Sequence, residues 1–321
     1  MSHIVVTGAN GFVGRVLCRR ALAEGHTVTA LVRHAGAGLP GVREWVHASA
    51  DFADIAAAWP ADLHADGVIH LAARVHVMRD EAPDPQAAFD ATNVAGTVRI
   101  AEAAHARGVR RFVFASSVKA VAEGDGGAPL AESAEPRPED PYGVSKLRAE
   151  RALAHLADAS GLDVVVVRPP LVYGPEVRAN FLQMMHAIWR GLPLPLGAIE
   201  ARRSVVYVDN FADALLRCAT DPRAAHGVFH VADDDAPSVS LLLRQVGRAL
   251  ERPARLFPVP LAALRAVAAL AGRRAQIDRL TGSLQLDTGK LKRTLEWRPP
   301  FSTEEGLRAT AVWYRSRHSR N

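Results

Sequence analysis

The sequence predicts an α/β protein in which a doubly wound parallel sheet is joined to a smaller, interleaved α+β lobe. Two observations support this fold class. Short apolar runs rich in β-branched residues alternate with longer helical patterns through the first half of the chain, and after residue 169 this alternation weakens and Pro-rich turns occur. Strands that are apolar on both faces belong in a parallel sheet covered by helices on each side. The 321 residues, 49% of them hydrophobic, are enough for a sizeable core.

Five segments have the pattern of buried strands, with runs of Val, Ile, Leu and Phe bounded by glycine or polar residues. They span residues 3–8, 27–33, 67–73, 110–117 and 163–169. We predict that residues 1–168 and about 205–230 form the sheet domain. Residues 169–204 and 231–321 are expected to form the smaller lobe.

Three helical patterns lie between these strands. The first begins near Gly11 and is expected to stop at Gly25, because glycine readily adopts the left-handed conformation at a helix C-terminus. The other two are long and amphipathic and run near residues 85–107 and 142–159. In a doubly wound fold they would pack side by side, and their outer faces are expected to join two copies of the chain in a homodimer.

Composition and charge exclude several classes of protein. The net charge is +5, but the 39 basic and 34 acidic side chains are interspersed without a basic run interleaved with aromatics, so we expect no nucleic-acid partner. The chain lacks a run of about 18 apolar residues and begins directly with a strand pattern, so we expect no membrane insertion and a cytoplasmic location. Cys18 and Cys218 are far apart and lack metal-ligand spacing, so no disulfide framework and no metal site are expected. The short apolar segment 261–272 is expected to be buried in the smaller lobe instead of lying on a membrane surface.

The segment "TGANGFVG" after the first strand places Gly8, Gly11 and Gly14 at intervals of three at the start of a helix. The first glycine permits a tight turn, the second lets the backbone approach a pyrophosphate, and the third allows close packing of the helix. The phosphate charge then faces the helix N-terminus. This motif predicts a dinucleotide site and identifies the sheet as a Rossmann sheet.

The choice of dinucleotide depends on the end of the second strand, where an acid normally binds the adenosine ribose of NAD. Here the strand ends with Val32 and Arg33 and has no carboxylate. Arg33, helped by Arg15, is suited to a 2′-phosphate, which favours NADP(H) slightly over NAD. Asp51 and Phe52 are expected at the end of a weaker third strand, where a carboxylate receives the adenine amino group or caps the next helix.

Tyr142 and Lys146 in "YGVSK" lie four residues apart and therefore share one helix face. A nearby ammonium favours the phenolate, so Lys146 is expected to lower the pKa of Tyr142 and make it a usable general acid or base. Ser116 and Ser117 end the strand "FVFASS". Because open α/β sheets place their ligands at strand C-termini, one of these hydroxyls is expected to hydrogen-bond a substrate oxygen beside Tyr142.

The motifs "TGANGFVG", "HLAA", "FASS", "YGVSK" and "RPPLVYGP" resemble, in this order, those of the extended short-chain dehydrogenase/reductase family, which includes UDP-galactose 4-epimerase. The resemblance extends over essentially the whole chain. It implies a catalytic triad of Ser117, preferred over Ser116, Tyr142 and Lys146. With the positions argued above, the expected cofactor-binding residues are Gly8, Asn10, Gly11, Phe12, Val13, Gly14, Arg33, Asp51, Phe52, Leu71, Ala72, Ala73, Tyr142, Lys146, Pro169 and Leu171.

The resemblance also implies a UDP-sugar substrate. It assigns contacts with the sugar to Ser117 and contacts with the diphosphate to Asn180 and Arg203, with Arg279 as a candidate second phosphate contact. Arginine suits this role because its planar fork of donors matches phosphate oxygens. Two alternatives remain open, namely that Asn180 caps a helix and that Arg279 is a solvated side chain. The segment "GLPLPLG" (191–197) resembles the part that lies against the base.

The residues after Ser117 bear on the reaction. The family's 4,6-dehydratases have an acidic pair there, whereas this chain has Val118 and Lys119, so dehydration is not expected. The missing ribose-binding acid and the segment "SSVKAVAEG", where epimerases show Val-Tyr-Gly, favour an enzyme that exchanges its cofactor. The chain most resembles reductases of UDP-4-keto-6-deoxy-N-acetylhexosamines in surface-polysaccharide (O-antigen) pathways. The alternatives are a UDP-hexose or UDP-N-acetylhexosamine 4-epimerase with tightly bound NAD and, more remotely, a non-catalytic NAD(P)-sensing regulator.

Overall fold

The computed structural model describes residues 1–36, 38–75, 83–270, 272 and 274–318. A seven-stranded sheet forms the larger lobe, and all its strand pairs are parallel. Its order is β3-β2-β1-β4-β5-β6-β9. The strands are β1 (His3–Thr7), β2 (Thr27–Val32), β3 (Arg43–Val46), β4 (Gly67–His70), β5 (Arg111–Ala115), β6 (Asp163–Arg168) and β9 (Val228–His230). The predicted α/β class and its five buried strands are confirmed.

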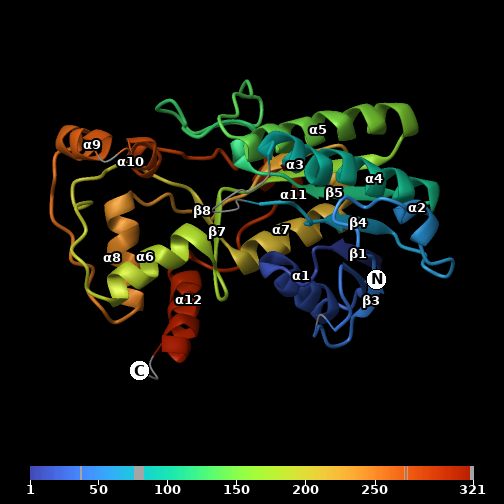
Figure 1. The fold of residues 1–321 in the computed structure, drawn as a ribbon. Helices are drawn as coiled ribbons and strands as arrows, with labels where there is room; N and C mark the ends of the chain where they lie inside the picture. Colours follow the sequence, from blue (N-terminus) through green and yellow to red (C-terminus); the bar gives the residue numbers. More distant parts are fainter. Residues whose placement is uncertain (37, 76–82, 271, 273, 319–321) are drawn as a thin grey trace.

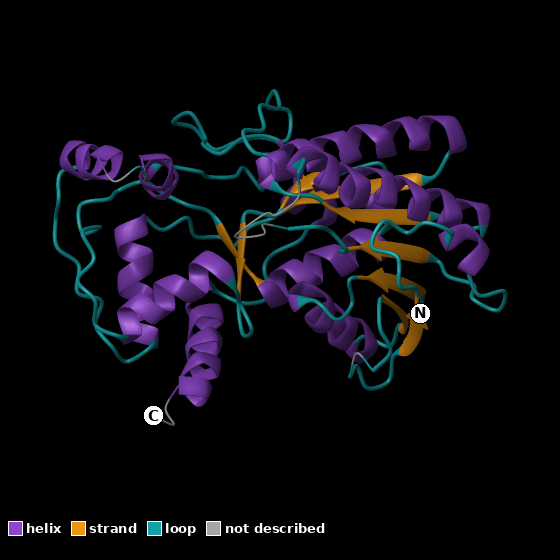
Figure 2. Cartoon of the chain, viewed as in Figure 1, coloured by secondary structure: helices purple, strands orange, loops and turns teal. Residues whose placement is uncertain are grey.

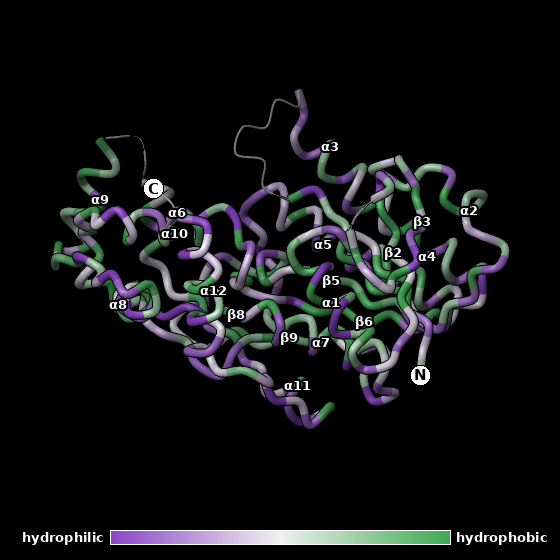
Figure 3. Tube along the Cα trace, turned by 90° about the horizontal axis from the view of Figure 1, so that it is seen from below, coloured by the Kyte–Doolittle hydropathy of each residue, from purple (hydrophilic) through white to green (hydrophobic). Residues whose placement is uncertain are grey.

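Helices cover both faces of this sheet (Figures 1 and 2). One face carries α1 (Phe12–Ala23) and α7 (Val208–Thr220), which contact each other. The opposite face carries α2 (Ile55–Ala58), α3 (Pro85–Asp90), α4 (Gly96–Ala106) and α5 (Pro141–Ser160). Hydrophobic residues are concentrated in the strands between these two layers (Figure 3). The sheet is therefore buried on both sides, which explains its continuous apolar strands.

The strand order reverses between β1 and β4, because the chain adds β2 and β3 on one side and β5, β6 and β9 on the other. Ligands of open α/β sheets bind at the strand C-termini around this point. The ends of β1, β4 and β5 therefore form the edge at which a site is expected.

The smaller lobe follows β6. Its strands β7 (Leu171–Tyr173) and β8 (Val205–Tyr207) pair in a separate two-stranded sheet. Its helices are α6 (Ala179–Trp189), α8 (Val239–Ala249), α9 (Leu261–Leu270), α10 (Arg274–Thr281) and α12 (Thr303–His318). The short helix α11 (Gly289–Leu295) packs instead against β9 of the larger lobe. Buried Asp233 accepts hydrogen bonds from the Tyr173 hydroxyl at 2.9 Å and the Asn210 amide at 2.7 Å. Asp233 thus joins the small sheet to α7 of the larger lobe, while the exact domain boundaries stay an interpretation of the sequence.

Local chemistry explains the ends of the key helices. α1 ends at Ala23, and Gly25 follows with φ +82°, as predicted. α5 begins behind Asp140, whose side chain accepts a hydrogen bond from the Gly143 amide at 2.7 Å, and it ends before Gly161 with φ +76°. An N-cap of this kind contributes roughly 1 kcal/mol. The start of α5, which carries Tyr142, is therefore fixed by its own sequence.

Two predictions about elements were wrong. β3 ends at Val46, and Asp51 lies beyond it in a turn in which Ser49 and Asp51 both accept from the Ala53 amide. The expected burial of segment 261–272 was wrong for most of its described residues, since Val267 is 67% and Leu270 92% exposed and only Leu264 and Ala268 are buried. In the described part of the chain α9 packs mainly against α10 at the outer edge of the lobe, where little other surface is available to cover it. No helix among the described residues is long and apolar enough to cross a membrane.

Candidate active site

The glycine loop between β1 and α1 has the shape that a dinucleotide requires. Gly8 has φ +66°, and a Cβ there would lie 2.9 Å from the Ala72 amide nitrogen. A Cβ on Gly14 would lie 2.3 Å from the carbonyl oxygen of Gly8. Gly11 is the N-cap of α1 and offers no side chain to its first amides. These amides and the positive end of the helix fit a pyrophosphate, so the residues present suit an NAD(P) cofactor.

Thr7 at the end of β1 joins the glycine loop to the segment that follows β4. Its hydroxyl accepts from the Leu71 and Ala72 amides, both at 3.1 Å, and lies 2.8 Å from Nδ1 of His70. Burial, helped by the charge of Lys146, lowers the pKa of His70 to about 3, so this imidazole is neutral. Leu71 and Ala72, directly after β4, therefore lie against Gly8 of the glycine loop, and Ala73 follows them. Asn10 lies in this loop, and Phe12 and Val13 begin α1.

Arg33 and Asp51 have different surroundings. Arg33 is exposed directly after β2, and Arg15 on α1 donates to the Asn10 carbonyl at 3.1 Å. Asp51 is held by Ser49 and by Arg99, whose Nη1 is 2.6 Å from its carboxylate, and these two partners lower the pKa of Asp51 to about 2. The Asp51 carboxylate is therefore ionised, and its contact with adenine stays a prediction. Phe52, with φ 55°, is buried beside it.

The side chains at the end of β5 are arranged in register with α5. The Ala115 carbonyl accepts from Nζ of Lys146 at 2.8 Å, Ser116 donates to Glu150, and Ser117 hydrogen-bonds Tyr142. The structure therefore brings Ser117, Tyr142 and Lys146 together at the C-terminal edge of the sheet. Ser116 points to a different partner, which agrees with the preference for Ser117.

The expected lowering of the Tyr142 pKa was wrong, because burial decides the direction of its net shift. Burial raises the pKa of Tyr142 to about 12, which outweighs the hydrogen bond with Ser117, and the Asp140 charge acts in the same direction as burial. Nζ of Lys146 lies 5.9 Å from the centre of the Tyr142 ring. Burial also lowers the pKa of Lys146 to about 7. Desolvation therefore dominates both groups, and at neutral pH Tyr142 carries its proton.

Asn93 is a site residue that the sequence analysis missed. It lies in a π-helical turn (Ala91–Ala95) between α3 and α4 and is almost fully buried. Its carbonyl oxygen accepts from the Arg74 amide at 2.7 Å, and its amide donates to Arg74 carbonyl at 3.0 Å and to Ser145 at 2.9 Å. Asn93 therefore fixes the segment after β4 to α5 beside Lys146. The only signal in the sequence was an asparagine inside a helical pattern.

Pro169 and Leu171 follow β6 beside the triad. The Pro169 carbonyl accepts from the Val118 amide at 2.9 Å, and Leu171 is exposed. Val118 itself is buried against Leu130, Leu284 and Leu286. Lys119 is paired with Asp140 at 2.7 Å and with Glu123 at 2.9 Å.

The predicted substrate contacts are spread over the smaller lobe. Asn180 is exposed in the first turn of α6, whose N-cap is Arg178, so the helix-cap alternative is excluded. Burial lowers the pKa of Arg203, and the carboxylates of Glu123 and Asp125 oppose this effect. Arg203 lies beside Gly282, where a Cβ would be 3.9 Å from its Nη2. Arg279 lies in α10, and its side chain is outside the described part of the structure.

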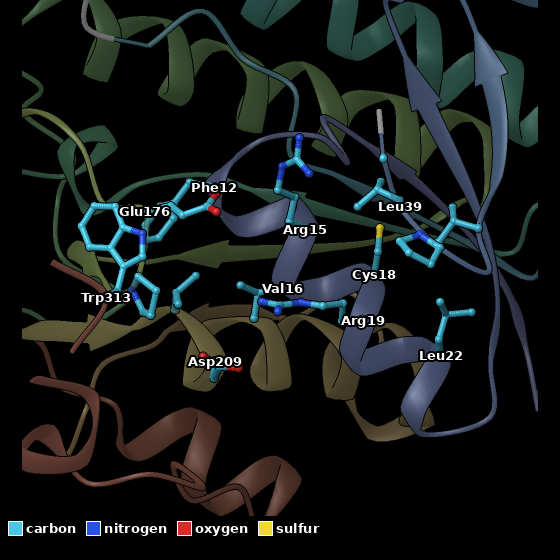
Figure 4. A pocket seen from close by; sticks show the side chains of 15 residues that line it. Phe12, Arg15, Val16, Cys18, Arg19, Leu22, Leu39, Glu176, Asp209 and Trp313 are labelled. Atoms are coloured by element: carbon cyan, nitrogen blue, oxygen red, sulfur yellow. The ribbon is translucent and has the colours of Figure 1, made fainter. Parts of the chain in front are cut away.

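A cavity of about 410 Å³ lies on the outer side of α1 (Figure 4). Phe12 and Arg15 of α1, Asp209 of α7, Glu176 and Trp313 line parts of it. Ser117, Tyr142 and Lys146 lie instead at the end of β5 and the start of α5 and do not line this cavity. In the described part of the chain no group of three or more His, Cys, Asp or Glu side chains is arranged to hold a metal ion.

Comparisons with known proteins identify the family of this chain. The model of the "NAD dependent epimerase/dehydratase family" matches residues 4–232. A UDP-glucose 4-epimerase of Vibrio cholerae is 39% identical over 314 residues, which are 96% of this chain and 94% of that protein. A GDP-6-deoxy-D-mannose reductase of Pseudomonas aeruginosa is 29% identical over 98% of both proteins. The crystal structure of a UDP-glucose 4-epimerase of Thermotoga maritima with UDP-glucose has a TM-score of 0.79 and 25% identity, covering 98% of this chain and 99% of that one. These similarities confirm the resemblance in the motifs, and the chain belongs to the NAD dependent epimerase/dehydratase family.

Proposed function

We propose that this protein is an NAD(P)-dependent oxidoreductase that reduces the C4 ketone of a UDP-4-keto-6-deoxy-(N-acetyl)hexosamine. The observation that carries the proposal is the protonated phenol of Tyr142, held beside Ser117 at the edge of the cofactor site. Reduction of a ketone consumes one hydride and one proton. The nicotinamide supplies the hydride when bound, and Tyr142 is placed to supply the proton.

In this proposal each residue of the triad has one task. Ser117 donates a hydrogen bond to the C4 oxygen and orients the ketone. Tyr142 transfers its proton to that oxygen as the hydride reaches C4, which yields the alcohol, and water restores the phenol. Lys146 holds the nicotinamide ribose and its positive charge stabilises the phenolate that remains. Asn180 and Arg203 are proposed to bind the diphosphate, and Arg279 is a weaker candidate for the same group.

The environment of the residues after Ser117 supports reduction over dehydration. Removal of water from the sugar requires an additional acid and base next to the triad hydroxyl. Val118 is buried in an apolar cluster, and the Lys119 ammonium is neutralised by two carboxylates. Neither side chain is suited to that proton transfer.

A UDP-hexose or UDP-N-acetylhexosamine 4-epimerase is the second candidate. The 39% identity to a protein named UDP-glucose 4-epimerase favours it. An epimerase begins by oxidising an alcohol and needs Tyr142 as a base, and it retains its cofactor through the cycle. The raised pKa of Tyr142 and the exposed Arg33 at the end of β2 favour the reductase.

The two candidates are separated by one assay. Cofactor that copurifies with the protein is identified by mass spectrometry, and the protein is then offered UDP-hexoses and a UDP-4-keto-6-deoxy-N-acetylhexosamine. We expect NAD(P)H to be consumed stoichiometrically with the ketone. Interconversion of two UDP-hexoses by protein with stoichiometric bound NAD, and without added coenzyme, would contradict the proposed reaction and support the epimerase.

Arg33 is proposed to favour NADPH by pairing with the 2′-phosphate. Arg33→Glu is then expected to lower kcat/KM for NADPH by about 10- to 100-fold relative to NADH, because a charge-assisted hydrogen bond of roughly 1.5–3 kcal/mol is lost and a like charge is added. Steady-state kinetics with both coenzymes measure this ratio. Arg43→Glu, which makes the same charge change at the start of β3, is the control. An equal effect of Arg33→Glu on both coenzymes would remove the NADPH preference from the proposal.

Three further features stay predictions. The homodimer is proposed to form through the helices near 85–107 and 142–159, whose α4 and α5 portions lie side by side on one face of the sheet (Figure 1). A role in surface-polysaccharide biosynthesis follows from the class of substrate proposed. The protein is proposed to act in the cytoplasm, because UDP-sugars would be available to it there.

A further inference from the structure

Glu150 continues the register that places the catalytic residues. The helix positions 142, 146 and 150 follow one another at one-turn intervals, and they contact the consecutive residues Ser117, Ala115 and Ser116 at the end of β5. Glu150 is thus one turn beyond Lys146 on the same helix face. Its contact with Ser116 fixes α5 against the strand that carries Ser117.

The Glu150 carboxylate is buried in an ion pair with Arg168 at the end of β6. The two side chains are 7% and 8% exposed. Arg168 donates from Nε at 3.0 Å and from Nη2 at 2.6 Å, one bond to each oxygen of Glu150. This two-point contact requires an ionised carboxylate and allows it little freedom. The negative charge of Glu150 is therefore held at a fixed distance from Lys146.

A buried ion pair is by itself weak evidence of a stabilising role. An apolar pair of similar volume is often as stable or more stable, because the desolvation of two charges offsets their attraction. Because this ion pair lies one helical turn beyond Lys146, its charge can instead influence the ionisation of Lys146.

Among the groups around Lys146, Glu150 differs from the others in carrying a negative charge. His70 on β4 is neutral, Tyr142 is protonated, and the Phe114 ring centre is 4.5 Å from the ammonium. Glu150 is the carboxylate whose charge opposes the effect of burial on the pKa of Lys146. Most of the other charged side chains on the described elements that pack against α5 have partners of their own: Asp90 with Arg148, Lys119 with Asp140 and Glu123, Arg99 with Asp51, and Asp163 with Arg111. Glu102 and His105 of α4 are exposed to solvent.

We propose that Glu150 is a positioning residue of the active site, whose carboxylate, anchored by Arg168 and Ser116, keeps Lys146 charged and seated against the end of β5. The effect of Glu150 on the charge and position of Lys146 is argued from these contacts alone. Its effect on turnover rests on the proposed function, in which the Lys146 ammonium stabilises the Tyr142 phenolate.

The test measures the titration of Lys146 directly. The chain has four lysines, so a protein labelled with ¹³C at the lysine ε-carbon gives few NMR signals, and the Lys146 signal is identified by its loss in Lys146→Met. In the wild type Lys146 is expected to titrate near pH 7. In Glu150→Gln we expect its midpoint to fall by roughly one pH unit, because an opposite charge nearby has been removed.

Two further variants guard against a merely structural effect. Glu150→Gln leaves the buried Arg168 without a carboxylate partner, which destabilises the fold. The double variant Glu150→Gln with Arg168→Met removes both charges and is therefore expected to be more stable than Glu150→Gln alone. Its Lys146 midpoint is also expected to lie below that of the wild type. Asp163→Asn breaks the half-buried pair with Arg111 at the other end of β6 and is the matched control, with loss of stability and an unchanged Lys146 midpoint.

The outcomes separate this inference from the proposed function. A Lys146 midpoint in the double variant equal to that of the wild type would overturn the role of Glu150, whatever reaction the protein catalyses. A lowered midpoint supports it, even if no UDP-sugar is turned over. If the wild type reduces the ketone, the alkaline limb of kcat/KM is expected to move to lower pH in Glu150→Gln by the same interval as the NMR midpoint.

Discussion

Tyr142→Phe is expected to lower kcat by roughly a thousandfold, within the range of about 10²–10⁴ for loss of a general acid. In the proposed reaction the phenol is the proton donor, which the end of β5 and the start of α5 place beside Ser117, and its pKa of about 12 keeps it protonated at neutral pH. Phenylalanine preserves the ring and its packing against Phe89, whose ring centre is 6.2 Å away. Coenzyme affinity should therefore change little.

The measurement combines steady-state turnover with coenzyme binding by fluorescence titration. Tyr314→Phe is a matched control, because it removes a buried hydroxyl that hydrogen-bonds His186 in the smaller lobe, far from the triad in sequence and on a different helix. It should lower stability and leave kcat unchanged. Wild-type turnover by Tyr142→Phe would refute the proposed mechanism.

Gly14→Ala is expected to weaken coenzyme binding by about a hundredfold and to lower the melting temperature. The new Cβ would lie 2.3 Å from the Gly8 carbonyl oxygen and 2.6 Å from Cα of Ala9. Both are backbone atoms of the loop proposed to bind the pyrophosphate, so the loop or the start of α1 must move. Overpacking of this kind costs about 1–3 kcal/mol in stability, and the displaced amides no longer face the phosphates.

Isothermal calorimetry with NADH and NADPH, together with thermal unfolding, measures both effects of Gly14→Ala. Gly67→Ala is the control, since its Cβ would meet the Arg111 carbonyl oxygen at an ordinary 3.5 Å in the same sheet, at the strand end remote from the site. Unchanged coenzyme affinity in Gly14→Ala would contradict the assignment of this loop to the pyrophosphate.

The sequence was a good guide where local stereochemistry decides the structure. The strands of a sheet that is covered on both faces must be apolar at nearly every position, and this pattern marked β1, β2, β4, β5 and β6. The glycine loop was also predicted from the sequence, because only glycine suits its backbone. Gly8 has φ +66°, and at Gly14 the neighbouring backbone leaves no space for a side chain. The spacing of Tyr142 and Lys146 placed both on one helix face for the same reason.

Where partners from distant segments decide, the sequence was a poor guide. The position of Asp51 depends on Ser49 and Arg99, and the exposure of α9 depends on how little of the lobe reaches it. The pKa of Tyr142 depends on burial, which a spacing of four residues does not report. Asn93 and Glu150 gave no signal of their own, because their roles come from contacts with Arg74, Ser145, Ser116 and Arg168.

The sequence by itself therefore determined the sheet, the glycine loop, the Tyr142–Lys146 face and the family, all of which follow from backbone geometry and short-range spacing. The tertiary structure alone decided that burial raises the pKa of Tyr142, and that the buried carboxylate of Glu150 lies one helical turn beyond Lys146. The physical reason is that desolvation and the fields of buried charges depend on every element packed around a group, and these elements are brought together only by folding.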